Sequence, residues 1–518
     1  MAFRFDAHTV AMVAVRTLVS STVRARPRGA ATATARRRVV PVRVPLAVGA
    51  ARAAARLTGL VHHRGTAIPG LVAQKIWPEA LVSLGAQLER TIVVVGTNGK
   101  TTTAGLISHI LGHDRALPIA NRSGANLRQG LVSTLVSASD LHGRIGHSND
   151  AGRDGVFEVD ELALEQVLPD LGPTVIVATN LFRDQLDRYG EADVIVAHWA
   201  AAFEHAAPGS RFVYCADDPR LAMLAASIEM PTVTFGLKDP PPDRHGTDAL
   251  GAATIDPIAC RTCGRPLVYG WRSVGHLGDF QCPEHHIRRA RPDIAVVPLG
   301  PVDRHGLMGD GPAGMPTVRI ETATGSAVSR PRLDGLPNAY NVAAAVAAAA
   351  ALGMDPLEAA AALDGAGGAF GRLERVAVGD RVLVLVLVKN TVSLDETTRL
   401  GPILDADVTL LALNDAPADG RDVSWIWDAP IAPLVADRLV VLTGTRAEDL
   451  ALRLKYDPAV TRDPPRSVRT EGKLEAALDA ALSQTPPGGT VVAVATYTAM
   501  MGLRAIAEAR GGVAPIPR

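Results

Sequence analysis

One short segment of the chain has the residue types and spacing of a phosphate-binding loop. Its glycines let backbone N–H groups approach phosphate oxygens, its lysine adds a positive charge, and the threonine after the lysine can place a hydroxyl on Mg²⁺. Val94 stands where the longer Gly-x4-Gly-Lys-Thr pattern would need glycine, so only the short pattern is met. We therefore predict a nucleotide site with Mg²⁺, at which Lys100 supplies a full positive charge to the phosphates. The loop consists of Gly96, Thr97, Asn98, Gly99, Lys100, Thr101 and Thr102.

Two pairs of metal-binding residues, separated by 18 residues, have the spacing of a zinc ribbon. Cys260 and Cys263 form the first pair, and Cys282 and His285 form the second. Three thiolates and one imidazole make a tetrahedral Zn²⁺ shell, and since protein side chains fill all four positions, the predicted site is structural. His286 is an alternative fourth ligand. The remaining interpretation is three reduced cysteines beside a surface histidine.

The apolar pattern indicates an α/β framework for both sites. Residues 91–95 are typical of a strand, and a helix is expected from Lys100 onward, so the loop connects the two. Between about 45 and 369, strand-like runs alternate with helical stretches rich in Ala and Leu, which predicts a parallel sheet. The Cys/His region, roughly 255–295, lacks this alternation and is predicted to be an insertion.

A second alternating set begins after Gly371. It predicts a doubly wound domain at 376–518, in which the unbroken Val/Leu run at 382–388 is typical of a strand buried on both faces. Strands are expected at 381–388, 408–413, 439–443 and 490–495, and helices at 447–454, at 473–482 and at the end of the chain.

Charge is unevenly distributed along the chain. Of 53 basic and 53 acidic residues, residues 1–60 contain eleven Arg but one Asp, so the remainder has 42 basic and 52 acidic residues. This acidic balance argues against a nucleic-acid partner. Residues 1–44 show no helical or strand period and are predicted to be a disordered extension, with contact to anionic lipid the less favoured alternative. No apolar run reaches 18 residues, so we expect a cytoplasmic protein.

Five further motifs, in order after the loop, resemble those of the Mur ligase and folylpolyglutamate synthetase superfamily. They span 157–161, 179–190, 216–219, 338–341 and 370–374. Members phosphorylate a carboxylate and let an amine attack the acyl phosphate. The resemblance implies that Glu158 binds a second Mg²⁺, that Asn341 lies near the adenine, and that Arg372 is a hinge arginine facing the nucleotide.

The same resemblance implies the fold class and the domains. It predicts an α/β protein with a Mur ligase-type central P-loop ATPase domain at 45–375, which contains the inserted zinc ribbon. A Rossmann-like C-terminal domain would follow at 376–518.

Within this superfamily the chain is most similar to the MurT family, the synthetase subunits of lipid II isoglutaminyl synthases. Gln185 stands where many Mur ligases have His, and no Lys between Lys100 and Lys238 can supply their carbamylated Lys. Residues 414–428 and 496–501 resemble the two most distinctive MurT stretches. The resemblance implies that ATP phosphorylates the α-carboxylate of D-glutamate in the lipid II stem peptide and that ammonia displaces phosphate, leaving D-isoglutamine.

A glutaminase must supply the ammonia, and such an enzyme has an activated cysteine thiolate. Cys215, the cysteine outside the metal cluster, ends a predicted buried strand and is expected to be a packed residue. The resemblance implies a separate GatD-type glutaminase subunit, forming a heterodimer that acts on lipid II at the inner face of the plasma membrane. Asp422 would reach into the partner's site and orient its His, with Asp419 and Asp428 as weaker candidates. All three could instead cap turns, and the nearby Trp425 and Trp427 would be interface or core residues.

Two alternatives and one departure from the family pattern remain. The chain could be a Mur-type or folylpolyglutamate-type ligase that adds an amino acid, or an ATP-binding scaffold without activity. The family usually has Lys-Asn-Pro-Ala-Gly where this chain has Lys389, Asn390 and then Thr-Val-Ser, so substrate contacts at this turn are an open question.

Overall fold

The computed structural model of the protein describes residues 42–60, 67–113, 115–121, 125–146, 153–183, 192–240, 258–299, 317–333, 335–367, 373–400 and 406–511. These ranges all belong to one compact unit, Val42–Arg518, and the other unit, Met1–Pro41, lies outside them. Most of the predicted N-terminal extension therefore falls outside the described residues. Helix α2 (Arg43–Leu60) begins before the predicted boundary at residue 44, because its apolar side continues to Val44, which is buried.

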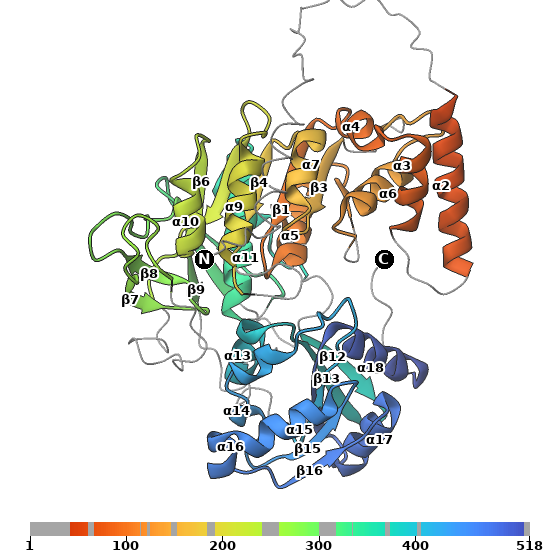
Figure 1. Ribbon diagram of the computed structural model, residues 1–518, viewed down its shortest axis with the longest axis vertical. Coiled ribbons are helices and arrows are strands. Elements are labelled where there is room, and N and C mark those ends of the chain that lie inside the picture. The colour runs from red at the N-terminus through yellow and green to blue at the C-terminus, as the bar shows by residue number, and fades with distance from the viewer. Residues whose placement is uncertain are drawn as a thin grey trace, which may run out of the picture. The chain divides into compact units, whose positions relative to one another are not determined.

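The larger sheet has nine strands among the described residues, in the order β11-β10-β9-β6-β5-β4-β1-β3-β2 (Figure 1). Neighbours from β2 to β9 are parallel, whereas β9, β10 and β11 are antiparallel. The predicted parallel sheet is thus confirmed, with an antiparallel edge that the sequence pattern did not indicate. The strands are β1 (Arg90–Val95), β2 (Ile119–Ala120), β3 (Asp154–Glu158), β4 (Val175–Ala178), β5 (Arg211–Cys215), β6 (Thr232–Leu237), β9 (Ile294–Leu299), β10 (Thr317–Glu321) and β11 (Ser326–Ser329).

One helix of this region, α11 (Leu336–Ala351), is buried along almost its whole length. It packs against α5 (Lys100–Gly112) and against β6 and β9, and its run of alanines permits this close approach because the side chains are small. Among the described residues no helix is both long and apolar enough to span a bilayer. The other helices are α3 (Ile68–Ile76), α4 (Ala80–Gly85), α6 (Arg128–Ala138), α7 (Leu164–Leu171), α9 (Ala192–Phe203), α10 (Pro219–Ala225) and α12 (Pro356–Ala361).

The predicted insertion lies between two strands that are neighbours in the sheet. β6 pairs with β9 in parallel, and the chain between them forms a separate two-stranded antiparallel sheet of β7 (Val268–Arg272) and β8 (Gly278–Gln281). This small sheet lies at one side of the larger one, at the left of Figure 1. We call the described residues 258–293 the ribbon.

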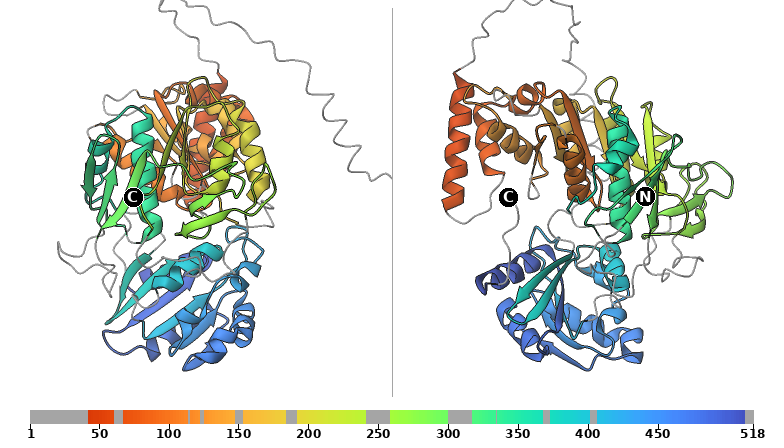
Figure 2. Two further views of the ribbon diagram at one scale, coloured as in Figure 1. Left: turned by 90° about the vertical axis from the view of Figure 1, so that its left-hand side faces the viewer. Right: turned by 180° about the vertical axis from the view of Figure 1, so that it is seen from behind.

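The C-terminal region contains a second, six-stranded sheet in the order β12-β13-β17-β14-β15-β16, with helices on both of its faces (Figure 2). All neighbours are parallel except β12 and β13. Successive residues of β13 enter opposite core clusters, with Val384 in one and Leu385 in the other, so its predicted burial on both faces is confirmed. This is a doubly wound, Rossmann-like arrangement.

The predicted strands and helices of this region agree with the structure to within two residues. The strands are β12 (Leu373–Val378), β13 (Arg381–Leu387), β14 (Val408–Ala412), β15 (Leu439–Thr443), β16 (Ser467–Thr470) and β17 (Thr490–Ala495). The helices are α13 (Thr391–Leu400), the 3₁₀ helix η3 (Ser424–Trp427), α14 (Ala432–Val435), α15 (Ala447–Tyr456), α16 (Pro458–Arg462), α17 (Leu474–Gln484) and α18 (Tyr497–Ala509).

Candidate active site

The predicted phosphate loop connects β1 to α5 and is hydrogen-bonded to the residues that follow β4. The backbone N–H of Thr97 donates to the carbonyl of Asn180 at 2.9 Å, and that of Asn98 donates to the Asn180 side chain at 2.9 Å. Gly96 has φ +124°, and a Cβ there would lie 2.3 Å from Thr179 Oγ1 and 2.7 Å from the Asn180 carbonyl oxygen. Glycine is therefore required at position 96 for both its conformation and its lack of a side chain.

Two oxygen atoms hold the ammonium group of the loop lysine, Lys100, in place. Lys100 Nζ donates to the carbonyl of Gly96 at 2.5 Å and to Glu161 Oε1 at 2.8 Å, and both charged side chains are buried. Burial raises the pKa of Glu161, against the opposing charges of Lys100 and Lys389. Glu161 lies inside a predicted motif, yet the sequence interpretation gave it no role. Its position three residues after Glu158 was the available signal.

A threonine and a carboxylate meet at the start of α5. Thr101 Oγ1 donates to Glu158 Oε2 at 2.6 Å, since β1 and β3 are neighbours and their carboxyl ends share one edge of the sheet. Asn121 fixes Glu158 by accepting its backbone N–H and donating to its carbonyl, each at 2.8 Å. A hydroxyl and a carboxylate are oxygen ligands of the kind that Mg²⁺ prefers, so these residues fit that ion.

Asn341 of α11 contacts the other end of the loop. Gly99 has φ +90°, and a Cβ there would lie 2.1 Å from Asn341 Oδ1, while Thr103 Oγ1 donates to the same oxygen at 3.3 Å. The structure therefore brings Asn341 to the loop, and its contact with adenine stays a prediction. Arg372 and Gln185 lie outside the described residues.

The turn after β13 also reaches the loop, despite its departure from the family pattern. Lys389 Nζ donates to the carbonyl of Thr97 at 2.7 Å. Ser393 Oγ accepts the backbone N–H groups of Lys389 and Asn390, at 2.9 and 3.1 Å, and the Ser393 N–H donates to Asn390 Oδ1 at 2.9 Å. This reciprocal capping of α13 stabilises the turn without the proline and glycine of the family pattern.

The ribbon gathers three cysteines and one histidine, whose ligand atoms all lie within 4.8 Å of one another. The group is Cys260, Cys263, Cys282 and His286. The distances from Cys263 Sγ to Cys282 Sγ and from Cys282 Sγ to His286 Nδ1 are 3.5 and 3.6 Å. The Cys₃His set suits tetrahedral Zn²⁺. Although burial opposes ionisation of the Cys260 thiol, backbone N–H groups of Cys263 and Thr262 lower its pKa to about 6.

The structure places His286, the alternative fourth ligand, in this group, and it does not place the predicted His285 there. The backbone N–H of His285 donates to the carbonyl of Cys282 at 2.9 Å, which forms a tight turn with φ +59° at His285. This turn leaves His285 outside the group and brings the next residue back over Cys282.

The three candidate aspartates near the C-terminal tryptophans differ in their surroundings. Asp419 is buried and accepts the backbone N–H and the hydroxyl of Thr498 at 2.7 and 2.5 Å, so it serves the fold. Asp422 is half-buried, and its Oδ1 accepts the backbone N–H of Ser424 at 2.8 Å, in a turn that directly precedes η3. Asp428 lies 3.8 Å from the Arg183 guanidinium. A partner-facing role of Asp422 stays a prediction.

Cys215 is fully buried at the end of β5. Burial raises its thiol pKa well above the usual range, and the nearby Asp217 and Asp218 raise it further. The thiol is therefore not ionised near neutral pH, which agrees with the prediction of a packed residue.

The sequence profile of the Mur ligase middle domain matches residues 94–252, which contain the loop and Glu158. A pseudomurein peptide ligase type C from Methanothermus fervidus has a similar fold, with a TM-score of 0.59 and 18% identity over 82% of this chain and 80% of that chain. MurF from Acinetobacter baumannii superposes with a TM-score of 0.57 and 16% identity over 85% and 80%. The loop and the Thr101–Glu158 pair, on this fold, define an ATP-dependent ligase of the Mur ligase type.

The profile of the MurT ligase C-terminal region matches residues 387–500. A Staphylococcus aureus (strain N315) protein named lipid II isoglutaminyl synthase (glutamine-hydrolyzing) subunit MurT is 30% identical over 79% of this chain and 87% of its own length. The Streptococcus pneumoniae (strain R6) protein of the same name is 29% identical over 86% and 93%. The chain belongs to the MurT family, which confirms the resemblance drawn from its motifs.

Proposed function

We propose that this chain is the synthetase subunit of a lipid II isoglutaminyl synthase, an enzyme of peptidoglycan biosynthesis. It would convert the α-carboxylate of D-glutamate in the lipid II stem peptide to the amide of D-isoglutamine. The observation that carries the proposal is the set of Lys100, Thr101 and Glu158 at one loop, in a chain whose relatives bear that enzyme's name.

The reaction would proceed in two steps. A carboxylate oxygen attacks the γ-phosphorus of ATP, forming an acyl phosphate and ADP. Ammonia then attacks the acyl carbon, the bond from that carbon to the phosphate oxygen breaks, and phosphate leaves while nitrogen loses a proton. Lys100 would neutralise charge that develops on the transferred phosphoryl group. Thr101 and Glu158 would hold Mg²⁺, which when bound screens the negative charge of ATP.

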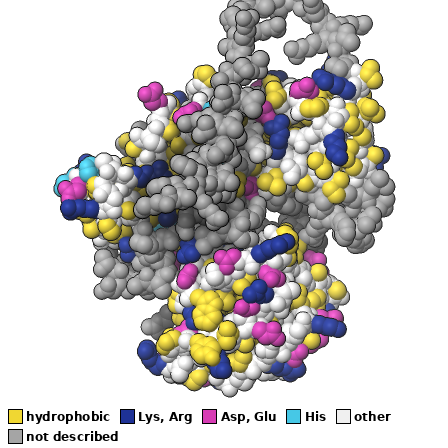
Figure 3. Space-filling view, in the orientation of Figure 1, with side chains coloured by type: hydrophobic (Ala, Val, Ile, Leu, Met, Phe, Trp, Pro, Cys, Tyr) yellow, Lys and Arg dark blue, Asp and Glu magenta, His cyan; other side chains and the backbone are white. Residues whose placement is uncertain are grey.

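The ammonia would come from a GatD-type glutaminase in a heterodimer with this chain. Two features support a partner surface on the C-terminal region. Trp427 is 43% exposed although its neighbour Trp425 packs on the core, and η3 packs against α15, where Leu452 and Tyr456 are also exposed. Apolar side chains are visible on this face in Figure 3. Large exposed aromatic side chains are enriched at protein interfaces.

Asp422 would complete the partner's glutaminase site, and its hydrogen bond to the Ser424 N–H allows a sharp test. Asn at position 422 still accepts the Ser424 N–H but carries no charge, whereas Ala has neither the acceptor nor the charge. If the carboxylate serves the partner, Asp422→Asn and Asp422→Ala both lose glutamine hydrolysis in the purified complex. Hydrolysis that survives in Asp422→Asn, or in both variants, contradicts the role.

The ribbon would bind a structural zinc ion through Cys260, Cys263, Cys282 and His286. The reaction would take place in the cytoplasm at the inner face of the plasma membrane, where the lipid-linked substrate is accessible.

The mass of the product distinguishes this proposal from its alternatives. The chain is incubated with its glutaminase partner, ATP, Mg²⁺, glutamine and lipid II. The proposal predicts the small mass decrease that accompanies conversion of a carboxylic acid to an amide. A large mass gain would instead identify an amino-acid-adding ligase, and an unchanged lipid would identify a scaffold.

A further inference from the structure

Two ribbon residues in the turn between β7 and β8 are buried among residues of α11 and of the segments that follow β4 and β5. His276 is 2% exposed and Ser273 is fully buried. The backbone N–H of Ser273 donates to the carbonyl of Leu277 at 2.8 Å, which closes the turn. The ribbon is therefore inserted into the domain that carries the phosphate loop, and each of these two side chains begins a chain of contacts toward that loop.

The first chain of contacts runs from His276 to Thr97. His276 Nε2 lies 3.3 Å from Asp218 Oδ2, and the same oxygen accepts the backbone N–H of Leu181 at 2.8 Å. The next residue, Phe182, has its ring centroid 4.9 Å from that of His276, and its backbone N–H donates to Thr97 Oγ1 at 3.0 Å. A ribbon side chain, His276, is therefore linked to the phosphate loop through a single intermediate residue, Phe182.

The second chain of contacts runs from Ser273 to Asn341. Ser273 Oγ lies 2.7 Å from the Tyr340 hydroxyl, which donates to Asp217 Oδ2 at 2.6 Å. Arg289, also of the ribbon, donates to Asp217 Oδ1 at 2.7 Å. Tyr340 directly precedes Asn341, which contacts the C-terminal end of the phosphate loop.

The charges make these contacts difficult to replace. Asp217 and Asp218 are both fully buried, so each carboxylate needs a positive or hydrogen-bonding partner. Burial raises the pKa of Asp217, against the charge of Arg289 and the hydroxyl of Tyr340. For Asp218 burial is outweighed, chiefly by His276, and the pKa is lowered. The ribbon thus supplies a partner for each buried carboxylate beside the loop.

We propose that the ribbon supports the phosphate loop, with His276 as the positioning residue, so that metal binding and nucleotide binding stabilise each other. The metal fixes the four ligands of the ribbon, the ribbon holds His276 and Ser273 in place, and these side chains hold the segments against which Thr97 and Asn341 lie. Coupling between two binding sites is reciprocal by thermodynamic necessity. The proposal relies on the proposed function only in that a nucleotide binds at the loop.

The coupling is measured in both directions with the full chain. Calorimetry gives the dissociation constant of AMP-PNP with Mg²⁺ for zinc-loaded and zinc-stripped protein, and a chromogenic chelator gives the rate of zinc release with and without that nucleotide. We expect stripping to raise the dissociation constant of AMP-PNP about tenfold, and we expect the bound nucleotide to slow zinc release. Equal dissociation constants, with equal release rates, overturn the proposal.

Variants that keep the metal ligands exclude simple unfolding of the stripped protein. His276→Phe keeps a ring but loses the nitrogen that lies 3.3 Å from Asp218, whereas His276→Gln keeps a polar side chain at that position. With zinc bound and the circular dichroism spectrum unchanged, we expect weaker AMP-PNP binding in His276→Phe, recovery in His276→Gln, and weaker binding in Tyr340→Phe, which breaks the second chain of contacts. AMP-PNP binding at the wild-type level in both Phe variants contradicts the proposal.

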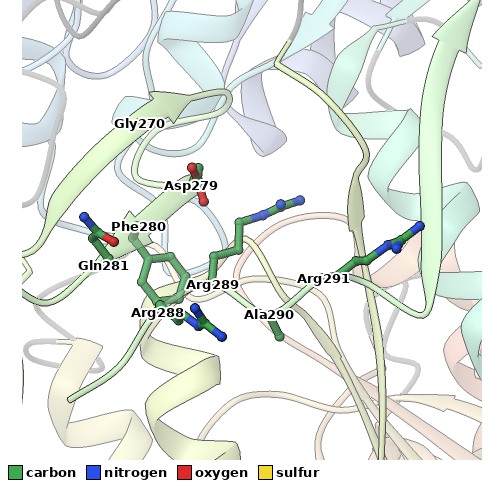
Figure 4. Close-up of a pocket in the computed structure, with 8 residues that line it drawn as sticks. All are labelled: Gly270, Asp279, Phe280, Gln281, Arg288, Arg289, Ala290 and Arg291. Carbon is green, nitrogen blue, oxygen red and sulfur yellow. The ribbon is translucent and has the colours of Figure 1, made fainter. Parts of the chain in front are cut away.

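A matched control is available on the same ribbon. Arg288 is exposed and lines a pocket of about 480 Å³ on the ribbon, with Arg291 and Asp279 also at its wall (Figure 4). It takes part in neither chain of contacts, so Arg288→Ala is expected to leave both AMP-PNP affinity and zinc release unchanged. A loss as large as that of His276→Phe would show that any change in the ribbon has this effect, and would overturn the role of His276.

Discussion

The ammonium nitrogen of Lys100 lies 2.8 Å from Glu161 Oε1, and the two side chains are only 9% and 6% exposed. A buried ion pair of this kind keeps each charge compensated, and removal of one partner leaves the other charge unpaired. The carboxylate thus holds the lysine at the mouth of the phosphate loop.

The pair gives the stability of the protein a defined pH dependence. Burial raises the pKa of Glu161 above 4.5, so the stability that its proton contributes is complete below that unfolded-state value and is lost as pH rises through the folded-state value. In Lys100→Met the opposing charge of the lysine is absent and the pKa rises further. The denaturant midpoint of this variant should therefore fall more steeply than that of the wild type as the pH rises above 4.5.

A double variant provides the control for that experiment. Glu161→Gln cannot ionise, so adding it to Lys100→Met should remove the extra slope. A slope that persists in the double variant would assign the pH dependence to another group.

The Thr101–Glu158 pair predicts a specific loss of Mg²⁺-dependent activity. Removing one group that stabilises transition-state charge typically lowers kcat by about 10²-fold or more. We expect Glu158→Gln and Thr101→Ala to lower ATP turnover by about this factor and to shift half-maximal activity to higher Mg²⁺ concentration. Ser108→Ala, on the same helix, removes only a bond to the carbonyl of Ala104 and should leave the Mg²⁺ titration unchanged. A Glu158→Gln variant with wild-type Mg²⁺ dependence would rule out the assigned role.

Alanine substitutions at two nearby glycines, Gly96 and Gly105, are expected to change the stability of the protein in opposite directions. At Gly96 the positive φ and the Asn180 carbonyl oppose a Cβ, so Gly96→Ala should cost about 1–3 kcal/mol of unfolding free energy and abolish nucleotide binding. Gly105 lies inside α5 with open space around its Cβ position, so Gly105→Ala should stabilise the protein by about 0.5–1 kcal/mol. Thermal and denaturant unfolding measure both changes, and a well-tolerated Gly96→Ala would contradict the geometry of the loop.

Much of this architecture could be predicted from local sequence. The loop follows from glycine and lysine spacing, and the strands of the C-terminal sheet follow from apolar runs such as 382–388, because burial on both faces requires such runs. The antiparallel edge β9-β10-β11 could not be predicted, since strand direction depends on non-local pairing. Glu161 was overlooked for a similar reason: its partner lies 61 residues earlier in the chain.

A single backbone angle determines which of two adjacent histidines lies in the Cys/His group. Spacing alone permits His285 or His286, and the left-handed conformation of His285 brings the latter into the Cys/His group. We therefore predict about one zinc per chain in the wild type and in His285→Ala, and a reduced zinc content with faster release in His286→Ala. Elemental analysis of the purified proteins measures this, and the reverse order of the two variants would restore His285 as the ligand.

We propose that the loop activates a substrate carboxylate by phosphorylation. The most direct measurement labels both oxygens of the D-glutamate α-carboxylate in lipid II with a heavy isotope and follows them by mass spectrometry in the complete reaction with the glutaminase partner, ATP, Mg²⁺ and glutamine. The acyl phosphate route predicts that each amide formed transfers one labelled oxygen to the inorganic phosphate released. Amide formation with unlabelled phosphate, or phosphate release without amide, would contradict the account.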